Sequence, residues 1–464
     1  MKRTMMVALA MTAAPIAANA QTTQGDVSVT IYNESLALVQ DTRTLDLKAG
    51  RTKVEFPEVS AQIRSETVTL AGADIAIVEQ NFDYDLLSPD KLMAKAVGQT
   101  ITIVRTNPAT GAETREQAKV LAANGGIVLQ IGNRIEVLRD DGLPVRVVFD
   151  KVPENLRARP TLSVTIQSEK GGAVPARLSY LTPGLGWKSD YVALFDEKAG
   201  TIDVQGWLTL TNNTGTTYTN AKTLLVAGLV NQVQPQQYGG YNRYNQYNQG
   251  DQSLETAGTE TARRGRLGDY YLYPLPERTT IAQAQTKQVG FLDVSAVPAR
   301  RAYQYVNGWL GSTPQPISAS SVIKFSTSAK GGLGDALPAG TVRAYMRDAQ
   351  GNPQFIGENQ IGHTSMGSGL AIRTGEAFDV KVSAIVEKRD QVGKRWITSM
   401  RYKLTNAKDE PVTVDLAQDG LWGDVKINAQ SQTGNRVSAD RVEWNVKLPA
   451  NGAVDVTAVF ESRW

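Results

Sequence analysis

Two carboxylates, Asp83 and Asp85, come nearest to a catalytic pattern in this chain. If residues 81–86 are extended, side chains two positions apart point to the same side of the strand. A pair of acids about 5 to 9.5 Å apart can hydrolyse a glycosidic bond. The same pair could equally be a solvated approach to a helix or part of a calcium ligand cluster. A carbohydrate-active hydrolase with paired carboxylates is therefore an alternative function.

Histidine and cysteine chemistry is almost absent from the sequence. The chain contains one histidine, His363, and no cysteine. A Ser-His-Asp triad would have a single possible base, and a histidine or thiolate zinc site could not reach its usual number of ligands. His363 lies in the turn-like segment 361–367, where we expect it to be exposed or locally hydrogen-bonded. We predict no cofactor and no metal site, and we favour a non-enzymatic protein.

A tyrosine repeat offers a different chemistry, that of stacking. Residues 234–250 are a polar low-complexity segment with tyrosines at every third position, namely Tyr238, Tyr241, Tyr244 and Tyr247. Their rings could bind sugars or dock a partner protein, because each has apolar faces and a polar tip. A tolerated repeat expansion between two strands explains them as well, and we favour it. We predict a disordered loop over about 233–266, closed by the solvated arginines Arg263, Arg264 and Arg266.

The first twenty residues resemble a secretory leader. Lys2 and Arg3 precede an apolar run over 5–14, and small residues at 18–20 fit a cleavage site between Ala20 and Gln21. No later segment approaches 18 uninterrupted apolar residues, so we predict no transmembrane helix. The mature chain is expected in the periplasm or outside the cell.

The net charge of the chain does not indicate a class of partner. The formal net charge is +3, and removal of Lys2 and Arg3 with the leader leaves 47 basic against 46 acidic residues. This near balance favours neither nucleic acid nor an acidic polymer. We predict no nucleic-acid partner and expect an envelope protein or a polysaccharide instead.

The elements that would hold these residues are mostly strands. Apolar and polar residues alternate with period two along the mature chain, for example over 26–32, 100–104, 162–166, 202–210, 380–386 and 454–460. Clusters of Gly, Asn and Asp between them are typical of tight turns. We therefore predict an all-β, multidomain β-sandwich protein.

One helix and one small barrel interrupt this pattern. Over 87–97, Ser88 can cap a helix and Pro89 fits its first turn, with Gly98 as terminator. Short strands at 100–105, 113–122, 126–130, 134–138 and 145–149 suggest a small barrel of the SH3 or OB kind. It has one aromatic residue, Phe149, and several acids, namely Glu113, Glu116, Glu136, Asp140 and Asp141, which argues against nucleic-acid binding. The predicted domains are a leader (1–20), an N-terminal β region ending in the helix (21–98), the barrel (99–152) and the sandwich region (153–464).

Several segments resemble one uncharacterised family of exported bacterial proteins. The motifs lie at 178–191, 206–215, 221–226, 271–275, 337–345, 355–358, 375–379 and 463–464. They are similar in type and order to the C-terminal β module of that family, which is catalogued as a domain of unknown function and is related to proteins named mucoidy inhibitors. The likeness covers about 160–464 and implies a secreted β-sandwich. It implies no catalytic residues.

Together these patterns predict an exported protein of the cell envelope that binds or scaffolds and is not an enzyme. A lesser alternative is an outer-membrane β-barrel, suggested by the terminal Trp464 and the alternation over 454–460. Irregular alternation in the longer strands argues against repeated lipid-facing segments.

The leader gives the first testable prediction. Export should remove residues 1–20, because charged, apolar and small residues follow one another in the order that signal peptidase reads. N-terminal sequencing of the protein from an envelope fraction should therefore begin at Gln21. A chain that retains Met1 in that fraction would contradict both the cleavage and the localisation.

Overall fold

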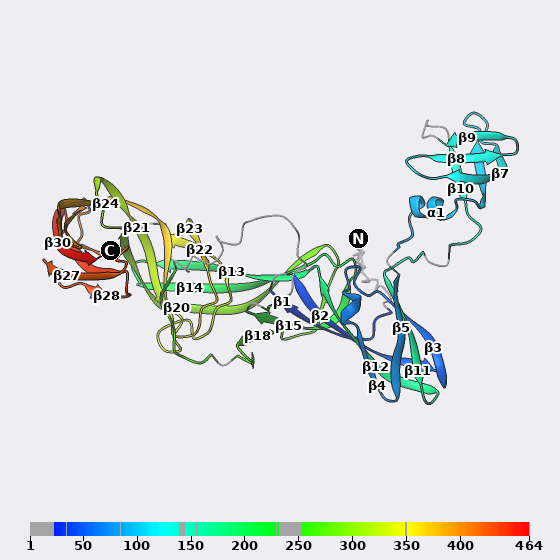
Figure 1. Ribbon diagram of the computed structural model, residues 1–464, viewed down its shortest axis with the longest axis horizontal. Helices are drawn as coiled ribbons and strands as arrows, with labels where there is room; N and C mark the ends of the chain where they lie inside the picture. The colour runs from blue at the N-terminus through cyan, green and yellow to red at the C-terminus, as the bar shows by residue number, and fades with distance from the viewer. Residues whose placement is uncertain are drawn as a thin grey trace, which may run out of the picture.

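The computed structural model describes residues 23–463, with gaps at 34, 84, 139–143, 154–155, 229, 232–252, 263 and 349. Figure 1 shows an elongated arrangement of sheets, with the C-terminal strands at one end and a small unit set apart on two connecting segments at the other. The predicted cleavage site at Ala20 and Gln21 and the four tyrosines of the repeat lie outside the described residues. The described residues are mostly strands with one α-helix, which confirms the all-β multidomain prediction. None of their helices is both long and apolar enough to cross a bilayer.

The N-terminal sandwich has two sheets. The strand order in the larger sheet is β17-β18-β15-β1-β2-β12-β4, and β19 also pairs with β15. Its strands are β1 (Asp26–Tyr32), β2 (Leu36–Leu47), β4 (Thr69–Gly72), β12 (Gly172–Pro183), β15 (Tyr218–Ala227), β17 (Arg266–Leu267), β18 (Tyr270–Pro274) and β19 (Thr279–Ile281). The smaller sheet has the order β3-β11-β5, with β3 (Gly50–Pro57), β5 (Ile75–Asp83) and β11 (Thr161–Ser168), and a 3-10 turn (Ser65–Thr67) precedes β4. Alternate side chains of both sheets, such as Val29 and Val164, form one buried core.

This pairing changes the predicted domain boundaries. β1 pairs in parallel with β15, and β2 pairs with β12, so strands from before residue 84 and after residue 160 build the same sandwich. The predicted boundaries at residues 98 and 152 would assign these paired strands to different domains. Pairing between segments so far apart leaves no local signal in the sequence, which is why the boundaries differ.

The separate unit is an insertion between β5 and β11. It contains α1 (Pro89–Lys95) and a meander with the order β10-β6-β7-β8-β9, made of β6 (Thr100–Thr106), β7 (Glu113–Ala122), β8 (Ile127–Ile131), β9 (Arg134–Leu138) and β10 (Val145–Val148). The Ser88 hydroxyl accepts a hydrogen bond from the Lys91 amide, and Gly98 has φ +83°, as the sequence predicts. The helix buries Met93 and Ala96 in the meander's core, so it belongs to this unit and not to the N-terminal region.

A fourth sheet, of fourteen strands, contains the remaining strands of the described chain. Its main path is β23-β22-β13-β14-β20-β21-β24-β25-β30-β27. The strands on this path are β13 (Leu185–Asp196), β14 (Thr201–Asn212), β20 (Gln285–Asn307), β21 (Thr313–Ser326), β22 (Gly340–Arg347), β23 (Pro353–Ile361), β24 (Gly369–Val392), β25 (Arg395–Asn406), β27 (Asp424–Gln430) and β30 (Gly452–Arg463). The strands off the path are β16 (Leu254–Thr256), β26 (Val412–Gln418), β28 (Asn435–Arg436) and β29 (Val442–Leu448).

Long strands carry this sheet through successive cores. β13 and β14 contribute Leu185 and Leu210 to the N-terminal core and Phe195 and Ile202 to a middle core. β20 spans 23 residues and β24 spans 24, and both pass from the middle core into a C-terminal core around Trp444. The sandwiches are therefore joined by strands that continue from one core into the next, as the long strands in Figure 1 show.

The second half of the predicted disordered loop is packed. β16 pairs with β24, and Ala262 is 4% exposed. The Arg264 Nε lies 2.9 Å from both carboxylate oxygens of Asp335. Its guanidinium carbon lies 4.4 Å from the ring centroid of Tyr273 and 5.6 Å from that of Phe291. The prediction of a solvated Arg264 is therefore wrong, because a cation held by a carboxylate and two rings can leave water.

We predict that Arg264→Ala lowers the free energy of unfolding by about 1–3 kcal/mol, because it leaves the largely buried Asp335 carboxylate without its partner. Denaturant unfolding should show that Asp335→Ala adds less in the Arg264→Ala background than alone. Lys330→Ala, an exposed loop substitution, is the control. Equal stability of the Arg264 and Lys330 variants would contradict the packing of this segment.

Candidate functional site

The two candidate catalytic carboxylates are each held by a different element. The Ser163 hydroxyl on β11 donates to Asp83 Oδ2 at 3.2 Å, and an Arg157 nitrogen lies 3.5 Å from the same oxygen. Asp85 instead pairs with Lys91 at 3.1 Å and Lys95 at 3.4 Å, both from α1. The two residues therefore anchor the base of the inserted unit.

Electrostatics also argue against Asp85 as a general acid. The hydrogen bond from Lys91 is the main cause that lowers the pKa of the Asp85 carboxyl. A glycosidase acid needs the opposite shift, so that it holds a proton near neutral pH. No group of three or more metal-ligating side chains occurs in the described part of the chain, so neither aspartate lies in such a cluster there.

His363 bridges two parts of the fold. Its Nδ1 accepts a hydrogen bond from the Ala339 amide at 3.2 Å, and its Nε2 lies 3.2 Å from the side-chain nitrogen of Asn33, in the turn after β1. Loss of solvent around the ring lowers the pKa of His363. The residue is exposed overall, as expected from the sequence, but its hydrogen bonds are not local, because Ala339 and Asn33 lie far from it along the chain. Its acceptor nitrogen is occupied by a backbone amide and is not positioned by a carboxylate.

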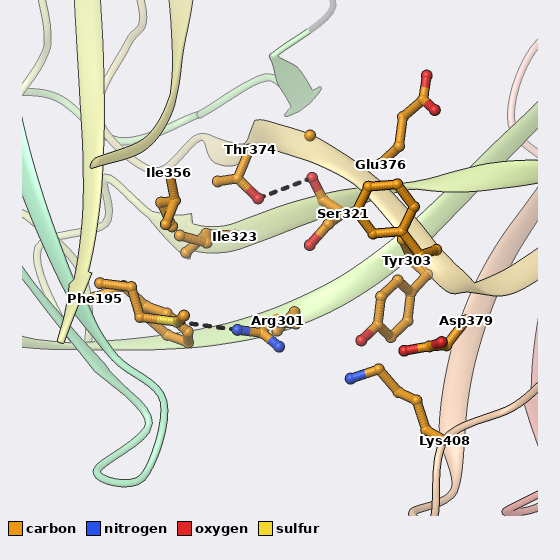
Figure 2. Close-up of a pocket in the computed structure, with 14 residues that line it drawn as sticks. Phe195, Arg301, Tyr303, Ser321, Ile323, Ile356, Thr374, Glu376, Asp379 and Lys408 are labelled. Carbon is orange, nitrogen blue, oxygen red and sulfur yellow. Dashed lines mark hydrogen bonds between the residues drawn. The ribbon is translucent and has the colours of Figure 1, made fainter. Parts of the chain in front are cut away.

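A cavity near the middle of the fold lies away from these residues. It has a volume of about 330 Å³ and lies where β20, β21 and β24 pass from the middle core towards the C-terminal core (Figure 2). Ile323, Ile356 and Phe195 form its apolar side, and the Thr374 hydroxyl bonds the Ser321 carbonyl at 3.2 Å beside them.

Two irregularities in β24 shape this cavity. Opposite β21, the register passes from Arg373 directly to Gly375 and from Ala377 directly to Lys381, so Thr374 and residues 378–380 have no partner on β21. Extra residues of this kind turn side chains away from the alternation of the strand. Phe378 is 82% exposed as a result, although it lies within a strand beside two cores.

Charged and aromatic groups meet at the other end of the cavity. Figure 2 shows Asp379 and Lys408 converging on Tyr303, whereas Glu376 points away from them. A hydrogen bond with Tyr303 is the main cause that raises the pKa of the Lys408 ammonium, which lies 5.7 Å from the Tyr303 ring centroid. This end therefore presents a fixed cation beside an aromatic ring and a carboxylate. Arg301, nearer the middle, is already paired with Glu197 at 3.0 Å.

Sequence reasoning missed this cavity as a site. The segment 375–379 entered only as a motif of resemblance, and Lys408 lies about thirty residues away along the chain. The local pattern gives no signal, because Phe378 keeps the apolar alternation with Val380 and Val382 and would be expected to be buried, whereas its ring is exposed.

The arginines of the meander are neutralised by its acids. Arg105 contacts Glu116 and Glu136, and Glu136 is the main cause that raises the pKa of Arg105. Arg134 lies 2.7 Å from Glu116, and Arg146 contacts Glu113. Such pairing leaves little unpaired positive charge on these arginines for a phosphate backbone. The absence of a nucleic-acid partner stays a prediction.

No protein-family model matches the chain, and no curated protein matches it. The resemblance to the exported bacterial family therefore stays a prediction.

His363 gives a pH prediction. Because the folded state lowers its pKa below the unfolded value, its contribution to stability is complete above about pH 6.5 and is lost as pH falls through the folded pKa. Protonation of Nδ1 would remove the acceptor of the Ala339 amide. Thermal unfolding between pH 7.5 and 5 should show a shallow decline that is weaker in His363→Ala, which lacks the chain's one histidine. An equal change of melting temperature with pH in the wild type and in His363→Ala would contradict a contribution of His363 to the pH dependence of stability.

Proposed function

We propose that this chain is an exported, non-enzymatic binding and scaffolding protein of the cell envelope. The single observation that carries the proposal is the cavity beside Phe378, built on strands that continue through two cores. A large apolar ring held in water by a strand irregularity is costly unless something covers it. The leader pattern at 1–20 and the family resemblance over 160–464 support export.

The cavity fits a segment of an envelope protein. An apolar side chain of such a segment would pack between Phe378 and Ile323, and its polar groups would meet Lys408 and Asp379. Aromatic anchors next to fixed charges are typical of protein interfaces. The carboxylates Asp83 and Asp85 serve as anchors of the inserted unit in this proposal, and no hydrolysis is assigned to them.

Affinity capture from envelope extract tests the proposal. The mature protein should retain a polypeptide that an unrelated periplasmic β-sandwich does not retain. Phe378→Ala should reduce that capture by about tenfold or more, because loss of a buried anchor costs about 1–2 kcal/mol or more of binding free energy.

Phe355→Ala is the matched control, since Phe355 is a second exposed phenylalanine that does not line the cavity. Both variants should melt at the same temperature as the wild type. Equal capture by the two variants would exclude the cavity as the docking site. Absence of specific capture would contradict the binding function.

A further inference from the structure

A second surface lies at the end of the C-terminal sandwich and is built from two loops. One loop joins β20 to β21 and carries Trp309, and the other joins β26 to β27 and carries Trp422. β20 and β26 pair in parallel, and Asn307 opposite Gln418 is the last pair. Both loops therefore leave the sheet from neighbouring strand ends. The indoles are 62% and 61% exposed, the most of any tryptophan in the described residues.

Each loop is anchored next to its exposed tryptophan. Leu310 follows Trp309 and is buried, and Leu421 precedes Trp422 and is buried, both in the C-terminal core. The Leu421 amide also donates to the Asp440 carbonyl at 3.0 Å. Adjacent side chains therefore take opposite directions, with leucine packed inward and tryptophan left in solvent.

A buried amide network fixes the first loop. The Asn307 side chain donates to the Trp309 carbonyl and to Gln418 Oε1, both at 2.8 Å. Gln418 returns a bond to the Asn307 carbonyl at 3.2 Å and accepts one from the Tyr402 hydroxyl. Buried polar groups that satisfy one another in this way specify one geometry. The backbone that carries the Trp309 indole is therefore held in a single position.

Two glycines complete the platform. A Cβ at Gly311 would lie 2.4 Å from the Trp309 ring, and a Cβ at Gly420 would lie 2.9 Å from the Trp309 Cα. One face of the Trp309 ring thus rests on the Gly311 backbone, and the loop that carries Trp422 passes directly beside Trp309. Any other residue at position 311 would displace the indole.

The charged side chains beside the Trp422 loop carry one net negative charge, from two acids and one arginine. Asp419 lies 3.3 Å from Arg441, which also lies 2.8 Å from Glu443. All three side chains are about one-third exposed. A pyranose ring has an apolar C–H face that stacks on an indole and hydroxyls that bond carboxylates and guanidinium groups, which is what this surface offers. A rim with one net negative charge favours a neutral ligand over a polyanion.

We propose that Trp309 and Trp422 form a binding platform for a neutral polysaccharide built of pyranose rings. This site is separate from the cavity at Phe378 and does not depend on the docking function proposed there.

Native gels cast with a soluble polymer test the platform on the mature full-length protein. The probes are hydroxyethyl cellulose, laminarin and galactomannan, with alginate as the anionic comparison. At least one neutral polymer should retard the wild type. Trp309→Ala and Trp422→Ala should each weaken retardation by about tenfold, and Trp309→Phe should retain part of it because a stacking ring remains.

Phe378→Ala is the matched control and should be retarded like the wild type, so failure of the cavity proposal and failure of this one give different results. The melting temperatures of the variants should match that of the wild type. The proposal is overturned if no neutral polymer retards the wild type, if Trp309→Ala is retarded equally, or if alginate alone retards it. Capture of a polypeptide through Trp309, with no retardation by any neutral polymer, would identify a protein site and also overturn it.

Discussion

The strands β14, β20 and β24 hold the described fold together, because each pairs with more than one neighbour and contributes to more than one core. β20 pairs first with β14 and then with β21 and β26. A strand of 23 residues extends about 75 Å, several times the length of a typical sandwich strand. Bending between the middle and C-terminal cores would break backbone hydrogen bonds whose donors and acceptors are buried, which is costly. The cores therefore behave as parts of one stiff body.

The long strands do not keep one register throughout. The register shifts where β14 meets β20, and Ala296 takes φ +57° while its amide bonds Asp203 at 2.8 Å. At the second shift Phe291 is the extra residue, and Gly206 gives it space because a Cβ there would lie 2.6 Å from its ring. The same device in β24 exposes Phe378. Irregularities that reconcile neighbouring cores thus also create the surfaces available for binding.

The sequence predicted what local rules decide. The cap at Ser88, the left-handed Gly98 and the five meander strands all follow from short-range signals, and all are found within a few residues of their expected places. Parallel pairing of β1 with β15 joins segments nearly two hundred residues apart, and no local pattern encodes it. Arg264 was misjudged for the same reason, since Asp335 and Phe291 reach it only through the tertiary fold. The cations beside the two candidate acids could not be predicted, because spacing places two side chains near each other and says nothing about which cations pair with them.

The two proposed binding surfaces share β20. Tyr303 and Arg301 line the cavity, and Asn307, the last residue of the same strand, holds the Trp309 loop. Tyr303 and Asn307 are four residues apart, or about 13 Å along an extended strand. Because β20 pairs with β26 from Tyr303 to Asn307, the distance between the cavity and the platform is fixed. A protein segment in the cavity and a polysaccharide on the platform would then be held at a set separation. Where both ligands belong to the same envelope structure, binding of one raises the local concentration of the other at its site, without any conformational change. A flexible linker between two domains would dilute that effect, which gives a physical reason for continuing one strand through two cores.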